Sequence, residues 1–339
     1  MPKLCVIPGD GIGQEVIPAA VAVLRAVIPD LETVEADAGW ECFLKRGVSV
    51  PDDTLNAIRA CGAALFGAVS SPSRKVEGYR SAILTIRQAL NLYANIRPVQ
   101  YWPHLSPRLG VDMLIVRENT EGLYSGRERR EGETAVAERV ITRAASRRIA
   151  RKAMALARSS DRRRLTIVHK ANVLPLTDGL FRDAVREVAA EFRQDGFMIE
   201  VDELLVDVAA LKMVAEPERF DVIVTTNLFG DILSDAAAYW GGGLGVAPSL
   251  NWGDTAAVAE PVHGSAPDIA GKGMANPLAA VLSGALLARH VWGRTAAADQ
   301  IETAVGRMLA KHNGLPGGKR ATTEAVVRGL LAQLAAVRQ

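Results

Sequence analysis

Leu4-Cys-Val-Ile-Pro-Gly-Asp-Gly-Ile-Gly13, followed by a helix-length segment from Glu15 to Val27, is the part of the sequence that indicates the fold most directly. The apolar run Leu4 to Ile7 predicts a buried strand, the glycines up to Gly13 predict a turn, and the apolar positions along 15–27 predict a helix. Short apolar runs and longer amphipathic segments alternate in the same way along the rest of the chain. This alternation predicts an α/β protein with a largely buried sheet.

The composition is that of a globular protein with room for two domains. The 339 residues are 49% hydrophobic and 23% charged, and the net charge of +2 does not favour nucleic acid or an anionic membrane as a partner. The longest apolar stretch, 278–288, is shorter than the roughly 20 residues of a membrane span, and no export signal is visible. The three widely spaced cysteines, Cys5, Cys42 and Cys61, are interpreted as reduced core residues. We therefore expect a soluble cytoplasmic protein.

One block of the chain is strongly basic. Residues 127–164 hold 13 Lys or Arg and 5 Asp or Glu. A run of this kind is typical of a solvated surface, so we expect a helix over Arg143–Ser159 and a protruding arm whose arginines pair with acidic side chains. The alternative, a nucleic-acid-binding module, would call for interleaved aromatic residues and a recognisable binding motif, which this block lacks.

The glycine motif at the N-terminus is not a standard dinucleotide-binding fingerprint. That fingerprint needs a glycine three positions after Gly11, where Gln14 stands, and an acidic residue after a second strand. Tight turn geometry explains the glycines equally well, although Gly11 and Gly13 would also let the backbone approach a ligand closely. We expect no standard Rossmann unit.

Two acids four residues apart follow the apolar strand predicted at Val222–Thr225. The segment Asn227-Leu-Phe-Gly-Asp231-Ile-Leu-Ser-Asp235 predicts a helix with both carboxylates on one face. They repel each other unless a cation lies between them, and oxygen ligands suit Mg²⁺ or Mn²⁺, although helix capping and surface charge are the alternative. Asp207, in Leu204-Leu-Val-Asp-Val, is a third acid in an apolar sequence, where an unpaired charge would be costly. Three acids favour a metal site.

Three arginines, a lysine and a tyrosine complete the polar set. Arg87, Arg97 and Arg117 are each at the end of a predicted segment, and forked guanidinium groups suit a substrate with two or three carboxylates, whereas each alone would fit a structural ion pair. Lys170 follows the predicted strand 165–168. Beside a divalent cation and arginines its charged form is disfavoured, so it is a candidate proton acceptor. Tyr124 is the remaining candidate, and without such neighbours both would be ordinary surface residues.

Four long motifs together resemble one enzyme family, the β-decarboxylating dehydrogenases, which include isocitrate and isopropylmalate dehydrogenases. They are Arg117-Glu-Asn-Thr-Glu-Gly-Leu-Tyr124, His169-Lys-Ala-Asn-Val173, Thr226-Asn-Leu-Phe-Gly-Asp-Ile-Leu-Ser-Asp235 and His263-Gly-Ser-Ala-Pro-Asp-Ile-Ala-Gly-Lys272. They stand in the family's order, and the resemblance spans nearly the whole chain. It implies an isocitrate/isopropylmalate dehydrogenase-like two-domain α/β fold with a largely parallel sheet core.

The resemblance also implies a domain organisation and an assembly. Residues 1–98 and 243–339 would form a discontinuous cofactor-binding domain. Residues 99–242 would form the substrate, metal and dimerisation domain, with an arm around 125–160. A homodimer or tetramer is expected, in which Lys170, Asn172 and Asp207 reach the site of the neighbouring subunit.

The cofactor implied by the resemblance is NAD. In the family the cofactor is held by a loop and an asparagine, here His263, Gly264, Ser265, Ala266, Asp268 and Asn276, with Asn172. A carboxylate at Asp268 can accept hydrogen bonds from the ribose hydroxyls and would repel the additional phosphate of NADP.

The resemblance assigns a role to each of these groups. Asp207, Asp231 and Asp235 would hold the metal, and Lys170 would take the substrate's hydroxyl proton, directly or through water. Asp207 would count with Lys170 and Tyr124 among the catalytic residues. Tyr124 would protonate the enolate that forms when CO₂ leaves. The three arginines would hold the substrate's carboxylates in register.

The loop before Arg87 is where members of the family differ in substrate. Arg80 and Ser81 offer donors for a distal carboxylate, which counts against isopropylmalate, while Ile83 and Val208 depart from the pattern of isocitrate enzymes. Lys75 to Gly78, with Ile83, is most similar to homoisocitrate dehydrogenases. Some of these that also accept isocitrate carry Arg where Leu84 stands. The expected reaction is the oxidative decarboxylation of homoisocitrate to 2-oxoadipate, with isocitrate, isopropylmalate or mixed specificity as alternatives.

Overall fold

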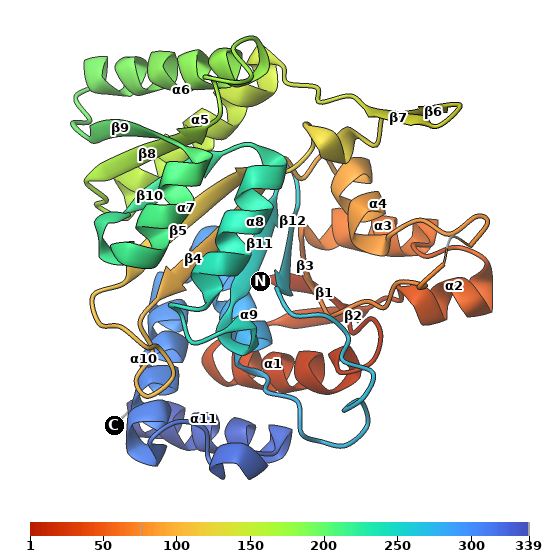
Figure 1. Ribbon diagram of the computed structural model, residues 1–339. Coiled ribbons are helices and arrows are strands. Elements are labelled where there is room, and N and C mark those ends of the chain that lie inside the picture. Colours follow the sequence, from red (N-terminus) through yellow and green to blue (C-terminus); the bar gives the residue numbers. More distant parts are fainter. Residues whose placement is uncertain (75, 338–339) are drawn as a thin grey trace. The chain divides into compact units, whose positions relative to one another are not determined.

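The computed structural model describes residues 1–74 and 76–337, and the chain forms two compact units (Figure 1). Unit 1 comprises Met1–Leu92, Tyr101–Pro107 and Gly241–Gln339. Unit 2 comprises Tyr93–Gln100 and Arg108–Trp240. The boundary expected at residue 98 differs from this division, because residues 94–100 form a strand that pairs along its whole length with 112–118 of unit 2. The functional labels given to the two domains stay predictions.

Unit 1 is a sheet with helices packed against it, and its strands follow the order β2-β1-β3-β12-β11. The pairs are parallel except for β11 with β12. Its strands are β1 (Lys3–Ile7), β2 (Glu32–Glu35), β3 (Ala63–Phe66), β11 (Pro248–Trp252) and β12 (Ala257–Pro261). Its helices are α1 (Gly13–Val27), α2 (Trp40–Arg46), α3 (Asp52–Cys61), α4 (Ala82–Ala89), α9 (Leu278–His290), α10 (Thr295–His312) and α11 (Thr323–Val337), with short 3₁₀ turns at η3 (Leu244–Val246) and η4 (Gly318–Arg320).

The N-terminal strand, turn and helix are as predicted, except that α1 begins at Gly13. Gly9 and Gly11 have φ angles of +74° and +55°, which residues other than glycine rarely adopt. A Cβ on Gly13 would lie 2.0 Å from the carbonyl oxygen of Pro8. The glycines are therefore required by the turn itself, which is the structural explanation that the sequence left open.

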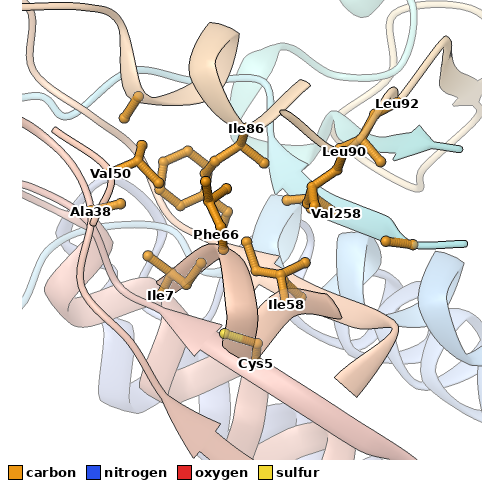
Figure 2. Packing of buried hydrophobic residues seen from close by; sticks show 14 residues of the cluster. Cys5, Ile7, Ala38, Val50, Ile58, Phe66, Ile86, Leu90, Leu92 and Val258 are labelled. Carbon is orange, nitrogen blue, oxygen red and sulfur yellow. The ribbon is translucent and has the colours of Figure 1, made fainter. Parts of the chain in front are cut away.

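The core of unit 1 is an apolar cluster that includes Ile7, the last residue of β1 (Figure 2). Ile7 of β1 and Phe66 of β3 are completely buried and pack with Ile58 of α3 and Ile86 of α4. Burial of such side chains contributes about 1.5–3 kcal/mol each. The cluster fixes α4, which carries Arg87, against the sheet.

Unit 2 has strands in the order β4-β5-β10-β8-β9, parallel except for β4 with β5. Its strands are β4 (Ala94–Gln100), β5 (Asp112–Glu118), β8 (Arg164–His169), β9 (Glu200–Leu205) and β10 (Val222–Thr225), with a separate hairpin of β6 (Glu128–Glu131) and β7 (Thr134–Ala137). Its helices are α5 (Arg143–Ser159), α6 (Thr177–Gln194), α7 (Val206–Ala215) and α8 (Asn227–Ala238), with 3₁₀ turns at η1 (Leu123–Ser125) and η2 (Pro217–Arg219).

The strand register of unit 2 brings the predicted polar residues to one edge. Thr225 at the end of β10 pairs with Arg117 of β5 on one side and with Val168 of β8 on the other. Lys170 and α8 therefore start from the same carboxyl edge of these parallel strands. This edge is where α/β sheets usually bind ligands.

The basic block is a solvated surface, as the charge pattern predicted. The β6–β7 hairpin is mostly exposed, and α5 directs arginines at acidic residues of α6. Arg143 and Arg147 both contact Glu187, at 2.6 and 2.8 Å. The opposite face of α5 is buried in the unit. The block is thus an ordinary amphipathic helix and an arm, with acidic partners of its own.

Cys5 and Cys42 are buried and Cys61 is partly buried, and all three are free thiols. Among residues 1–74 and 76–337, no helix combines the length and the apolar character needed to cross a membrane.

Candidate active site

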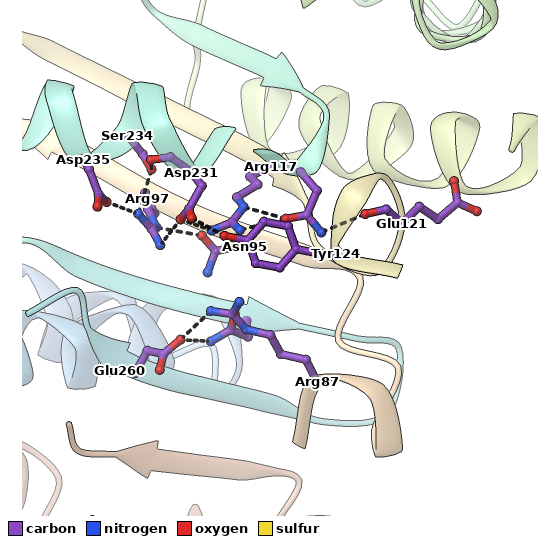
Figure 3. A network of polar contacts seen from close by, with 12 residues as sticks. Arg87, Asn95, Arg97, Arg117, Glu121, Tyr124, Asp231, Ser234, Asp235 and Glu260 are labelled. Carbon is purple, nitrogen blue, oxygen red and sulfur yellow. Dashed lines mark hydrogen bonds and ion pairs between the residues drawn. The ribbon is translucent and has the colours of Figure 1, made fainter. Parts of the chain in front are cut away.

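Arg117, near the end of β5, is the buried centre of a polar network in unit 2 (Figure 3). Its side chain is only 1% exposed. Nε and Nη2 both donate to Oδ1 of Asn227, at 3.1 and 2.7 Å, and Nη1 donates to Oδ1 of Asp231 at 2.5 Å. This bidentate contact to the first residue of α8 fixes the guanidinium plane.

Arg97, from β4, joins the two acids of α8. Its Nη1 lies 2.6 Å from Oδ1 of Asp235, and its Nη2 lies 3.3 Å from Oδ1 of Asp231. Nη1 also donates to Ser234, and Nε donates to Asn95 at 2.8 Å. Since one guanidinium contacts both carboxylates, the prediction that these acids share a face is confirmed. In this chain the cation between them is an arginine.

Tyr124, in η1, donates its hydroxyl hydrogen to Oδ2 of Asp231. The Arg117 guanidinium lies over its ring, 5.0 Å from the centroid. Burial raises the pKa of Tyr124 above its usual value, and the hydrogen bond and negative charge of Asp231 raise it further, while Arg117 lowers it. The phenol is therefore held in its protonated form, as a proton donor must be.

Lys170 and Asp207 form a second, separate pair. Nζ of Lys170, which follows β8, contacts Oδ1 of Asp207 in the first turn of α7. The Asp207 side chain is 60% exposed, so the expectation of an apolar setting was wrong. Apolar neighbours in the sequence point elsewhere because α7 turns this residue outward. The hydrogen bond from Lys170 lowers the pKa of Asp207. Asn172, in the turn after β8, is exposed.

The three acids predicted as metal ligands do not meet within one chain. Over residues 1–74 and 76–337, no group of three His, Cys, Asp or Glu side chains is placed to hold a metal ion. Asp231 and Asp235 nevertheless supply hard carboxylate oxygens on one helical face, and the Asp235 side chain is 55% exposed. This donor chemistry fits Mg²⁺ or Mn²⁺.

Unit 1 carries the other predicted arginines. Arg87, on α4, is buried and pairs at 2.8 Å with Glu260 of β12, which also accepts from Asn251 at 2.8 Å (Figure 3). Arg80 is exposed, and Ser81 precedes α4 and is partly exposed. Lys75, in the same loop, lies outside the described residues.

The predicted cofactor loop follows β12 in the same unit. Ser265 is buried, accepts from the backbone N–H of Ile12 at 2.9 Å and has its hydroxyl 2.8 Å from that of Ser70. Gly264 and Asp268 are exposed, His263 and Ala266 are partly buried, and Ala266 has a φ of +39°. Burial lowers the pKa of His263, so its ring is neutral near pH 7. The side chain of Asn276 donates to the carbonyl of Gly245 and accepts from the backbone N–H of Leu278, the first residue of α9. These hydrogen bonds connect the end of the loop to η3 and α9.

Several residues that complete these contacts were missed from the sequence. Asn95, Asn227 and Glu260 are isolated polar residues in apolar strands or at a helix start, with no spacing that marks them. Asp10 is another, buried and accepting from three backbone N–H groups, those of Trp40, Glu41 and Ser70. The available signal was their position within or beside the motifs that carry the arginines and glycines.

A model of the family described as "Isocitrate/isopropylmalate dehydrogenase" matches residues 3–324. With the fold and the polar network above, this match defines an enzyme of the decarboxylating hydroxy-acid dehydrogenase class. The chain belongs to the isocitrate/isopropylmalate dehydrogenase family, and the resemblance noted in the sequence is confirmed.

Relatives and solved structures cover nearly the whole length of the chain. An isocitrate/homoisocitrate dehydrogenase of Thermus thermophilus is 54% identical over 333 residues, 98% of both chains. A 3-isopropylmalate dehydrogenase of Methanothermobacter thermautotrophicus is 46% identical over 327 residues, 95% of both chains. The crystal structure of an isocitrate dehydrogenase from Methylococcus capsulatus superposes with a TM-score of 0.91 at 41% identity, covering 98% of this chain and 99% of the other. The predicted fold class is confirmed.

Proposed function

We propose that this enzyme catalyses the NAD-dependent oxidative decarboxylation of homoisocitrate to 2-oxoadipate and CO₂ with a divalent metal. The observation that carries the proposal is that Asp231 and Asp235 contact Arg97 and Arg117. The protonated Tyr124 donates a hydrogen bond to Asp231 as well. The arrangement combines hard metal ligands, carboxylate-binding forks and a proton donor at the carboxyl edge of parallel strands.

Mg²⁺ or Mn²⁺ would be held by Asp231 and Asp235 of one subunit and by Asp207 of another. Bound there, it supplies Lewis acidity, which favours loss of the substrate's hydroxyl proton and stabilises the negative charge that develops when CO₂ leaves. The contact of the Arg97 guanidinium with both acids supports this assignment, since it places their negative charges on one face. Family membership supports a metal requirement.

Lys170 is the proposed acceptor of the hydroxyl proton. Its side chain is only 24% exposed and holds a carboxylate partner, Asp207, that can take part in passing the proton onward. Tyr124 is the proposed donor that protonates the carbon left by CO₂. The raised pKa of its phenol keeps that proton available at neutral pH.

Substrate orientation is assigned to the arginines. Arg97 and Arg117 are locked by hydrogen bonds to Asn95 and Asn227, so little side-chain freedom remains to be lost on binding. Arg87 is held by Glu260. Arg80 and Ser81, at the start of α4, are the proposed contacts for the distal carboxylate that distinguishes homoisocitrate from isopropylmalate.

We also propose that the active form is a homodimer or tetramer with shared sites. Four large apolar side chains are 59–68% exposed: Leu211 and Val214 of α7, Ile232 of α8, and Tyr239 directly after α8. Such side chains on neighbouring helices favour burial against a second copy. Asp207, exposed near them on α7, would then reach the partner's metal site together with Lys170 and Asn172.

The proposed cofactor is NAD, held by the loop 263–268, Asn276 and Asn172 of a neighbouring subunit. Asp268 is exposed, and its backbone carbonyl accepts from Lys272 at 2.6 Å, which directs that lysine toward the backbone. The Asp268 carboxylate can then accept from ribose hydroxyls and disfavour NADP. We propose a cytoplasmic enzyme, since the cysteines are unpaired and need no oxidising compartment.

Isocitrate and isopropylmalate are the alternative substrates, because similar relatives carry both names. The test is the initial rate of NADH formation with homoisocitrate, isocitrate and isopropylmalate, each with NAD and NADP, with Mg²⁺ or with chelator. We expect the highest kcat/KM with homoisocitrate and NAD, and no turnover in chelator or in Asp231→Asn. A higher kcat/KM with isopropylmalate would overturn the substrate assignment.

A further inference from the structure

Arg139 connects the base of the β6–β7 hairpin with the start of α8. Its Nη2 donates to the hydroxyl of Thr226 at 2.9 Å, and its guanidinium lies over the Phe229 ring, 4.7 Å from the centroid. The same Nη2 lies 2.8 Å from Oδ1 of Asp178 on α6. One half-buried side chain, 16% exposed, therefore contacts two different helices.

Asp178 carries this contact to Lys170. Its side chain is completely buried in the first turn of α6, and its Oδ2 accepts the backbone N–H of Lys170 at 2.6 Å. The residue that bears the proposed proton acceptor is thus anchored by a buried carboxylate. That carboxylate is in turn compensated by Arg139.

The segment after Arg139 is tied to the loop of Tyr124. The backbone N–H of Gly122 donates to the carbonyl of Val140 at 2.8 Å, and Thr142 donates to the Glu121 carboxylate from both its N–H and its hydroxyl. The Glu121 carbonyl accepts from the side chain of Asn227 at 3.1 Å. Arg139 therefore stands where the segments of Lys170, Tyr124 and α8 meet.

We propose that Arg139 and Asp178 are a positioning pair, which holds the backbone of Lys170 in a fixed relation to the start of α8 and to the Tyr124 loop. The inference rests on the proposed function for the role of Lys170. A buried ion pair often adds no stability over apolar residues of the same size, so its presence here is better explained by the geometry it imposes. Its contacts reach the segments that carry Lys170 and Tyr124, the proposed proton-transfer groups, and the helix α8, which carries two of the proposed metal ligands.

The main test is the double variant Arg139→Met with Asp178→Asn. It removes both charges together, which avoids leaving one buried charge alone, and the amide introduced by Asp178→Asn keeps an oxygen for the Lys170 N–H. The control is Arg162→Met, which removes a similarly buried arginine whose two acidic partners are more exposed than Asp178. Arg162 is 18% exposed and pairs with Asp112 and Asp221 in the same unit, but at the opposite ends of β5 and β10.

We expect the kcat of the double variant to fall about 10–100-fold while the KM values for substrate and NAD change less than about 2-fold. The acidic limb of its kcat–pH profile should move. Arg139→Lys, which keeps the positive charge, should have a kcat between those of the double variant and the wild type. The acylation rate of the Lys170 amine by acetic anhydride, read by mass spectrometry, should differ from wild type in the double variant and not in Arg162→Met.

A folded double variant with wild-type kcat, pH profile and Lys170 acylation would overturn the inference, as would a change in thermal stability alone. The proposed function fails separately, if the wild-type enzyme oxidises none of the three hydroxy acids. In that case the acylation of Lys170 still decides whether this pair positions the lysine.

Discussion

Gly230 allows a test of how tightly Arg117 is held, because two opposing effects meet at this position. Gly230 lies within α8 and is buried. A Cβ added there would lie 2.6 Å from Cγ, 2.7 Å from Cβ and 3.1 Å from Cδ of Arg117. Gly230→Ala therefore adds a good helix former and at the same time pushes a methyl group into a side chain that is 1% exposed.

The magnitudes predict that the clash wins. Replacing Gly by Ala inside a helix stabilises by about 1 kcal/mol. Overpacking a buried site costs about 1–3 kcal/mol, and each hydrogen bond to a charged group lost from Arg117 costs about 1.5–3 kcal/mol. With one such bond lost, we expect a net destabilisation of about 1.5–5 kcal/mol. Because Arg117 must move, kcat/KM should also fall about 100-fold.

Gly306→Ala is the matched control. Gly306 lies inside α10, and a Cβ there meets nothing within 4 Å, so only the helix propensity should change. Thermal unfolding followed by circular dichroism should show a melting temperature lowered by roughly 2–7 °C for Gly230→Ala and raised by about 1–2 °C for Gly306→Ala. A Gly230→Ala enzyme as stable and as active as wild type would refute the claim that Arg117 is locked in place.

Three further predictions concern protonation and the cofactor. Because the pKa of Tyr124 is raised in the folded state, the stability that its hydroxyl contributes is complete below pH 10 and is lost as the pH rises through the folded-state pKa. The difference in unfolding free energy between wild type and Tyr124→Phe, measured by urea unfolding, should therefore be constant from pH 7 to 9 and shrink above pH 10. Burial raises the pKa of Cys5 to about 12 and that of Cys42 to about 11. A thiol reagent at pH 8 should therefore leave both cysteines unmodified in the folded enzyme and label both in urea, and rapid labelling of either before unfolding would contradict this. Asp268→Ala should lower the ratio of kcat/KM for NAD over NADP by about 10-fold or more, and an unchanged ratio would remove Asp268 from cofactor recognition.

Local patterns predicted the elements of the fold but not all of its polar partners. The strand before Gly9, the strand Val222–Thr225 and the helix Arg143–Ser159 follow from apolar runs and helical spacing, which depend on neighbouring residues. Asp178 and Glu260 could not be predicted in this way. Their partners, Arg139 and Arg87, are 39 and 173 residues away, and only the folded chain brings each pair together.

Asp207 shows a different limit of the same reasoning. Its apolar sequence neighbours suggested a buried acid, but the start of α7 turns its side chain outward, where Lys170 is its partner. An acid that a single chain leaves 60% exposed can still become a metal ligand if a second chain covers it. The outward direction of Asp207 and the exposed apolar side chains of α7 and α8 then have one explanation, since the surface that buries the apolar groups would also deliver the third carboxylate. A dilution series that lost activity in parallel with dissociation of the dimer would support this explanation, and full activity of a monomer would exclude it.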